Sequence, residues 1–138
     1  MNAEYVRERN RFTRATAGFL ALAQTGGLLT LIRSDEIQLL GGTIMFVSAL
    51  CTLVAYVAAC KYFAMARGHA DAWILVPLCI VPVVVGGLAY FFLDNAAGIQ
   101  VGTIVGQAIP PIVLAIGAIP LWLLPDRTRR VDSPENTP

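Results

Sequence analysis

The stretch Lys61–Ala72 contains the only histidine and the only lysine of the chain, so it is the first place to look for chemistry. A serine hydrolase needs a histidine that a carboxylate orients, with a serine beside it. His69 and Asp71 are two residues apart on one loop and cannot orient each other in this way, and no serine is nearby. We predict no catalytic residue here and expect His69 to be a solvated or interfacial loop residue. A pH-sensing or lipid-headgroup role for His69 is the alternative.

The three cysteines, Cys51, Cys60 and Cys79, form no C-x-x-C pair and lie inside or at the ends of apolar runs. Free cysteines of this kind behave as small buried hydrophobic residues, and a metal site would need histidine or carboxylate ligands close by. A pair of histidines for haem and a P-loop for nucleotides are also missing from the sequence. The sequence therefore predicts a non-enzymatic protein with no cofactor and no metal site.

Apolar residues make up 57% of the 138-residue chain, and charged residues only 14%. Soluble domains usually carry about 25% charged residues, and a fold of this size could not bury so much apolar surface in one core. Four apolar runs account for the composition, and their lengths suit membrane-spanning helices. The runs are residues 15–32, 37–60, 73–93 and 103–124.

The predicted fold is an all-α membrane protein whose four transmembrane helices occupy residues 15–127. Residues 1–14 form a basic N-terminal segment that suits a short surface helix. Residues 128–138 form a polar tail that we expect to be disordered. Because polar residues and glycines interrupt the first run, a signal peptide with its cleavage site at Ala21–Ala23 is the competing interpretation.

The basic residues indicate how the helices are oriented. Four alternating spans place both termini and the loop Lys61–Ala72 on one side, which then carries nine of the ten basic residues, and Arg33 lies on the other side. Cytoplasmic loops of membrane proteins are enriched in lysine and arginine. We therefore expect a membrane protein with both termini in the cytoplasm. The net charge of +1 gives no field that would attract nucleic acid.

The two halves of the chain resemble each other around their outer turns. Gly26-Gly-Leu and Gly42-Thr-Ile in the first half correspond to Gly86-Gly-Leu and Gly102-Thr-Ile in the second, and an Ile-Gln pair lies between them in both. Each half would be a hairpin that starts and ends in the cytoplasm, and the two would form a tandem parallel repeat in a four-helix bundle. Chance similarity between glycine-rich membrane sequences is the alternative.

Small and polar residues must hold such helices together, because lipid gives them no hydrophobic reason to associate. The candidates for helix packing, or for oligomerisation, are Gly98, Gly102 and Gly106 in and before the fourth run, and Ser48, Thr52, Ala55 and Ala59 in the second. Gln100, Thr103 and Gln107 share one helix face, which would either bond to another helix or line a polar cavity. Prolines in the third and fourth runs predict bent helices.

The basic residues of the predicted cytoplasmic side, together with His69, form a candidate contact for anionic lipid headgroups or for a protein partner. They are Lys61, Arg67, Arg127, Arg129 and Arg130, together with the N-terminal arginines. No aspartate, glutamate, lysine, arginine or histidine lies inside the predicted spans. Proton-coupled transporters and voltage sensors place such residues within the membrane, so both classes are disfavoured.

The segment Cys60–Gly68 fits the pattern C-x-x-[YF]-A-x-A-[KR]-G, and an apolar run that begins at Trp73 follows it. In these residues the chain resembles a group of small uncharacterised bacterial inner-membrane proteins. Their next helix often ends in Leu-Pro-Asp-Arg, and this chain has Leu124-Pro-Asp-Arg127 one hairpin later. The resemblance implies a location and a size class, and no mechanism.

The same loop has a physical interpretation. The second helix is expected to continue through Tyr62 and Phe63 and to end where Gly68 adopts the left-handed conformation. Arg67 would lie in the last turn, where the helix dipole favours a cation, and Asp71 would cap the next helix.

The most consistent role is that of an accessory, scaffold or assembly component that packs against itself or another membrane protein. A small channel or carrier that uses the proline-rich second hairpin is the alternative. A lipid-modifying enzyme is the least supported, because no acid or base lies near the predicted membrane core.

Overall fold

The computed structural model describes residues 3–69, 77, 79–81, 83–86, 88 and 104–127. Within these residues the structure is all-α and contains no strand, as predicted. The helices are α1 (Ala3–Leu29), α2 (Asp35–Ala66) and α4 (Ile104–Trp122). The described residues between 77 and 88 are helical as well.

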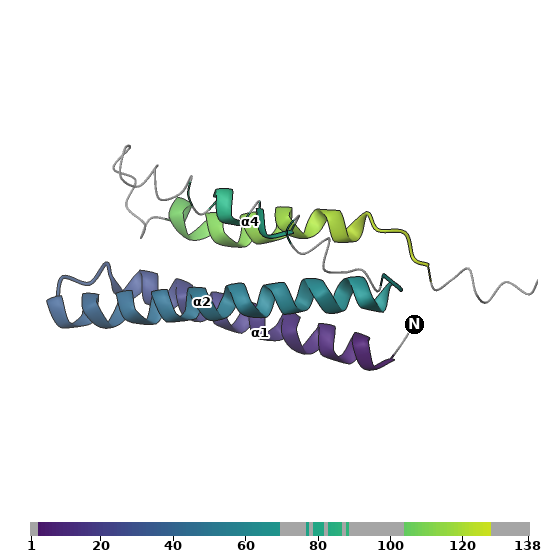
Figure 1. Cartoon of the computed structure of the whole chain (residues 1–138). Coiled ribbons are helices and arrows are strands. Elements are labelled where there is room, and N and C mark those ends of the chain that lie inside the picture. Colours follow the sequence, from purple (N-terminus) through teal and green to yellow (C-terminus); the bar gives the residue numbers. More distant parts are fainter. Residues whose placement is uncertain are drawn as a thin grey trace, which may run out of the picture.

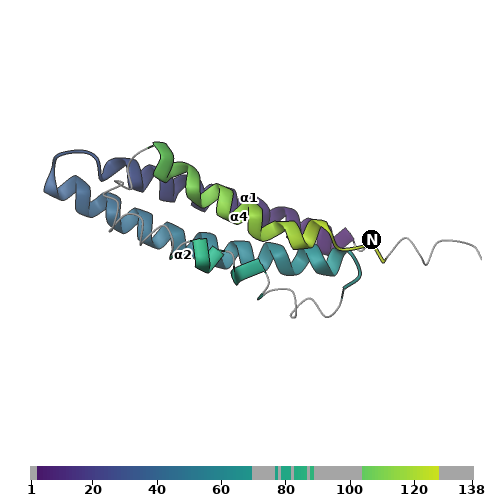
Figure 2. The same ribbon diagram turned by 90° about the horizontal axis from the view of Figure 1, so that it is seen from above.

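The helices lie along one another in two layers (Figures 1 and 2). α1 and α2 form an antiparallel pair in one layer. In the other layer, α4 lies over α1, and the helical residues between 77 and 88 lie over α2. α2 and α4 run in the same direction, so their C-terminal ends meet the N-terminal end of α1 at one end of the molecule (Figure 1). α1 packs mostly against α2, and α4 touches both helices more sparsely.

α1 is one continuous helix that joins the basic segment to the first apolar run. The sequence suggested a short surface helix followed by a span that reaches residue 32, but α1 covers Ala3–Leu29. The chain tightens beyond Leu29: the N–H groups of Leu31 and Ile32 bond to carbonyls three residues back, both at 3.1 Å. Bonds of this 3₁₀ type are common where a helix ends.

α2 begins directly after this turn. Ser34 is the N-cap residue, with an extended backbone, and its carbonyl accepts the N–H of Gln38 at 2.9 Å. Asp35 and Glu36, which the sequence placed in the turn, instead form the first helical turn. Carboxylates there stabilise the positive end of the helix dipole.

Near the turn the backbones of α1 and α2 touch. A Cβ atom on Gly26 would lie 2.6 Å from the backbone nitrogen of Met45 and 2.8 Å from the carbonyl oxygen of Gly41. A Cβ atom on Gly41 would lie 2.8 Å from the carbonyl oxygen of Gly26 and 2.8 Å from Cβ of Leu29. Only glycine allows two helices to approach this closely at both positions.

Between Ser48 and Ala55, the face of α2 that meets its neighbours consists of small residues, two of them polar. Ser48, Thr52 and Ala55 are buried, and the Thr52 hydroxyl donates to the Ser48 carbonyl at 2.7 Å. The outer face carries large apolar side chains, with Leu39 75% and Val54 71% exposed. Soluble helices usually show the opposite arrangement.

Among the described residues, α2 is the one helix that is long and apolar enough to cross a membrane, with a mean hydropathy of 2.1. A shorter apolar helical stretch covers Ala108–Trp122. The span predicted at residues 37–60 lies inside α2, whereas most of the one predicted at 73–93 lies outside the described residues.

Gly26→Ala and Gly41→Ala are expected to force α1 and α2 apart, since each new methyl group would meet backbone atoms. We expect each variant to lose about 1–3 kcal/mol of unfolding free energy, the usual cost of overpacking. Denaturant unfolding in detergent micelles, followed by circular dichroism, measures this loss. Gly18→Ala and Gly42→Ala are matched controls, because a Cβ atom at either position has nothing within 4 Å. Equal stability of all four variants would contradict the contact.

Candidate functional site

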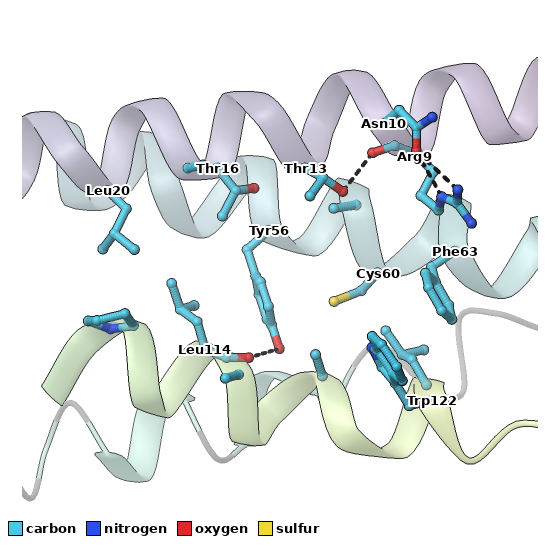
Figure 3. A pocket seen from close by; sticks show the side chains of 16 residues that line it. Arg9, Asn10, Thr13, Thr16, Leu20, Tyr56, Cys60, Phe63, Leu114 and Trp122 are labelled. Carbon is cyan, nitrogen blue, oxygen red and sulfur yellow. Dashed lines mark hydrogen bonds between the residues drawn. The ribbon is translucent and has the colours of Figure 1, made fainter. Parts of the chain in front are cut away.

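A groove lies between α1 and α4, and α2 forms its floor (Figure 3). Its volume is about 470 Å³, within the range of about 300–1,000 Å³ that is usual for small-molecule sites. Alanine, leucine and proline side chains from α1 and α4 form most of its walls, among them Ala17, Leu20, Pro111 and Ala115. The groove is therefore apolar along most of its length.

Tyr56 sets the distance between α2 and α4 at the floor of this groove. The side chain is buried, and its hydroxyl donates to the carbonyl oxygen of Leu114 at 3.1 Å (Figure 3). Gly117 makes room for it, because a Cβ atom there would lie 2.6 Å from the Tyr56 oxygen. Neither residue was expected from the sequence to have a particular role. A signal existed, since a tyrosine inside an uncharged apolar run needs a partner for its hydroxyl.

Polar side chains gather at one end of the groove, where α1 begins. The Nε and Nη2 atoms of Arg9 donate to the side-chain oxygen of Asn10 at 3.2 and 3.0 Å. The guanidinium carbon of Arg9 lies 5.6 Å from the centre of the Phe63 ring. One turn farther along α1, Phe12 stacks on Tyr62 of α2 with ring centres 5.4 Å apart. Arg9 is thus held on a helix that is fixed to α2.

The hydroxyl and thiol groups of the groove are already engaged or buried. The hydroxyls of Thr13 and Thr16 donate to carbonyls four residues back in α1, both at 2.8 Å. Cys60 is buried in a core cluster with Tyr56 and Cys79. The described residues contain no group of three potential metal ligands. The groove therefore offers an apolar surface and a cation at one end, which suits binding better than acid–base catalysis.

Arg67 lies at the end of α2, where its own helix dipole favours a cation, but its side chain reaches the end of α4. Its Nη1 atom donates to the carbonyl oxygens of Leu121, Trp122 and Leu124 at 3.0, 3.0 and 2.8 Å. Its guanidinium carbon lies 4.7 Å from the centre of the Phe63 ring. Because α2 and α4 are parallel, the negative ends of two helix dipoles meet here, and a cation between them is stabilising.

The end of α2 is a Schellman motif. Gly68 has a φ of 81°. Its N–H bonds to the carbonyl of Met65 at 3.0 Å, and the N–H of His69 bonds to the carbonyl of Ala64 at 3.1 Å. The prediction that the helix continues through Tyr62–Phe63 and stops at a left-handed Gly68 is confirmed.

His69 has a partner that the sequence did not predict. Its Nε2 atom lies 3.0 Å from the carbonyl oxygen of Pro125, and since a carbonyl only accepts, Nε2 carries the proton in this contact. The N–H of Arg127 also donates to the carbonyl of Arg67, at 3.3 Å. The loop after α2 therefore binds the segment that follows α4.

The remaining predicted site residues are distributed as follows. Ala59 is half-buried and lines the groove. Ser48, Thr52 and Ala55 precede it in the same helix and do not line the groove. Lys61 is half-buried, with its amino group 6.0 Å from the centre of the Tyr62 ring. Outside the described residues lie Gly98, Gln100, Gly102, Thr103, Arg129 and Arg130, together with the side chain of Gln107. Gly106 lies in the first turn of α4.

Tyr56→Phe removes only the hydroxyl, and we expect it to lower the unfolding free energy by about 0.5–1.5 kcal/mol, the net value of one hydrogen bond. Gly117→Ala should cost more, about 1–3 kcal/mol, because its methyl group takes the place of the hydroxyl. The double variant should lose less than the sum, since phenylalanine lacks one of the two atoms that the methyl group meets. The other atom, the carbonyl oxygen of Cys79 at 2.9 Å, remains in place. Additive losses in denaturant unfolding would contradict the proposed fit.

Arg67→Gln is expected to loosen the end of α4, because three carbonyls lose a charged donor. Amide hydrogen exchange at Leu124 and Arg127 should become about tenfold faster or more, given about 1.5–3 kcal/mol for a charged hydrogen bond. Arg67→Lys should rescue only part of this effect, since lysine keeps the charge but lacks the planar fork. Arg14→Gln, at an exposed position of α1, is the control. Unchanged amide hydrogen exchange in Arg67→Gln would show that this side chain does not stabilise the end of α4.

The chain matches no family model, no curated protein and no solved structure. The motif in Cys60–Gly68 therefore remains a resemblance in sequence pattern. Four residues of this motif have a structural role. Ala64, Arg67 and Gly68 form or follow the end of α2, and Cys60 packs in the core beside Tyr56.

Proposed function

We propose that the protein is a four-span protein of a bacterial inner membrane that serves as a non-enzymatic accessory or assembly component. One observation carries this proposal. Along α2 the large side chains Leu39, Phe46 and Val54 point outward, while Ser48 and Thr52 are buried. Such a helix is stable when its outer face meets lipid or another membrane protein.

The distribution of charge supports an orientation with both termini in the cytoplasm. The N-terminal end of α1 and the C-terminal ends of α2 and α4 meet at one end of the molecule, whereas the turn with Arg33 lies at the other (Figure 1). The arginines of the N-terminal segment, Lys61, Arg67 and Arg127 belong to the first end. This asymmetry has the sign expected when that end faces the cytoplasm.

The accessory role follows from what the surface offers. Ile112, Ile116 and Ile119 of α4 are each at least half exposed, as are several large side chains of α2. These faces present apolar contact area to a second copy or to another membrane protein. A channel or carrier draws less support, because the groove beside Pro111 is apolar and would not hold a file of water or ions.

A fusion of green fluorescent protein to the C-terminus tests both parts of the proposal. We expect fluorescent cells, since this reporter folds in the cytoplasm, and in mild detergent a fluorescent species clearly heavier than one chain with its micelle. Size-exclusion chromatography with mass measurement gives the second result. Dark cells containing full-length fusion would contradict the orientation. A species with the mass of one chain and no associated protein would contradict the accessory role.

A further inference from the structure

The groove between α1 and α4 has the polarity of a phospholipid: a long apolar part and a cation at one end. We propose that it binds one acyl chain of an anionic phospholipid, whose phosphate group is held by Arg9. This inference rests on the proposed membrane location, and it adds a specific ligand to the general attraction between basic residues and anionic membranes.

The apolar part of the groove has the dimensions of one leaflet. Pro111 and Trp122, which lie at its two ends on α4, are eleven residues apart, a helical rise of about 16 Å. Half of the hydrocarbon core of a bilayer measures about 15 Å. Ala17 on α1 and Ala115 and Ala118 on α4 leave the space that a methylene chain needs.

The polar end can hold a phosphate. Arg9 has five N–H groups, and two of them bond to Asn10. No other hydrogen bond and no ion pair of the Arg9 guanidinium occurs within the described part of the chain, so both N–H groups of Nη1 are available. Its neighbours differ, because Arg7 and Arg11 both lie within 4.0 Å of Glu8. Guanidinium groups bind phosphate oxygens through paired, charge-assisted hydrogen bonds.

The position of Arg9 relative to the membrane fits a headgroup. Trp122 lies at the same end of the groove and is 71% exposed, and Leu123 beside it is 78% exposed. Tryptophan is enriched at the interface between hydrocarbon and water. On the proposed orientation, Arg9 is therefore at the level of the cytoplasmic headgroups, where anionic phospholipids lie.

The occupant is a lipid chain and not a further helix because the space is too narrow. Some Cα atoms of α1 and α4 lie within 8 Å of each other, whereas the axes of two packed helices are themselves about 8–10 Å apart. A third helix could not enter between α1 and α4 without separating them. An acyl chain, which has no side chains, can lie over α2 in this space.

Fluorescence quenching in nanodiscs tests the proposal. Trp73→Phe leaves Trp122 as the sole tryptophan. The discs contain unlabelled phosphatidylcholine and a small fraction of one brominated lipid. This lipid is either phosphatidylglycerol or phosphatidylcholine, with the bromine atoms near the ester end of the acyl chain. We expect phosphatidylglycerol to quench Trp122 at several-fold lower mole fraction. Arg9→Gln should remove most of this preference, because the phosphate loses its charge-assisted hydrogen bonds, whereas Arg14→Gln, which does not line the groove, should preserve it.

A second pair of variants tests the groove itself. Ala115→Phe fills it, and Ala49→Phe adds the same ring at an exposed position of α2 outside it. Only Ala115→Phe should abolish the preference for phosphatidylglycerol.

Equal quenching by the two lipids, unaffected by Arg9→Gln, would overturn the lipid site and leave the membrane location standing. Absence of quenching by either lipid would overturn the membrane location itself. A preference lost in Ala115→Phe together with a change from dimer to monomer would assign the groove to a second copy, and would also overturn the proposal.

Discussion

α2 packs closely against α1 and less closely against α4. The groove between α1 and α4 depends on this difference. Near the turn, Gly26 and Gly41 allow the backbones of α1 and α2 to touch. Toward the other end, the ring of Tyr56 stands between α2 and α4, and its hydroxyl is bonded to Leu114. Because α2 meets α1 backbone to backbone and α4 through an aromatic side chain, α4 packs less closely on α2 than α1 does. The groove over α2 is the space that remains.

The end of the molecule where three helix termini meet fixes one wall of that groove. Parallel α2 and α4 bring two negative dipole ends together, an unfavourable arrangement that the guanidinium of Arg67 offsets by donating to Leu121, Trp122 and Leu124. Leu121 and Trp122 also line the groove. Because Arg67 lies at the end of α2, it ties the position of α4 to the helix that forms the floor. The Nη1 donors of Arg67 are therefore used within the fold. Arg9, on the opposite wall, keeps N–H groups that bond to no described residue.

Local features could be predicted from the sequence, and contacts across the chain could not. The end of α2 at Gly68 follows from a rule about one residue and its immediate neighbours, and the lengths of the apolar runs indicate the all-α structure that the described residues show. Arg67 was expected to act on its own helix, but its partners are more than fifty residues away. His69 was expected to be a solvated or interfacial loop residue, and its contact with Pro125 could not be predicted because the two residues are far apart in the sequence. Nothing in the sequence distinguishes Gly117 from another glycine in an apolar run. Its importance depends on the position of the Tyr56 side chain, which belongs to another helix.

The glycines that the proposed repeat places in corresponding positions, Gly26 and Gly86, meet different surfaces. Gly26 lies against backbone atoms of Met45 and Gly41, whereas a Cβ atom on Gly86 would lie 2.7 Å from both methyl groups of Val113. Each glycine thus faces the following helix, which a common ancestor of the two hairpins would explain. A valine side chain nevertheless stands between Gly86 and α4, where the first hairpin has direct backbone contact. If the halves share an ancestor, the contacts between the helices of the two hairpins have therefore diverged at this position.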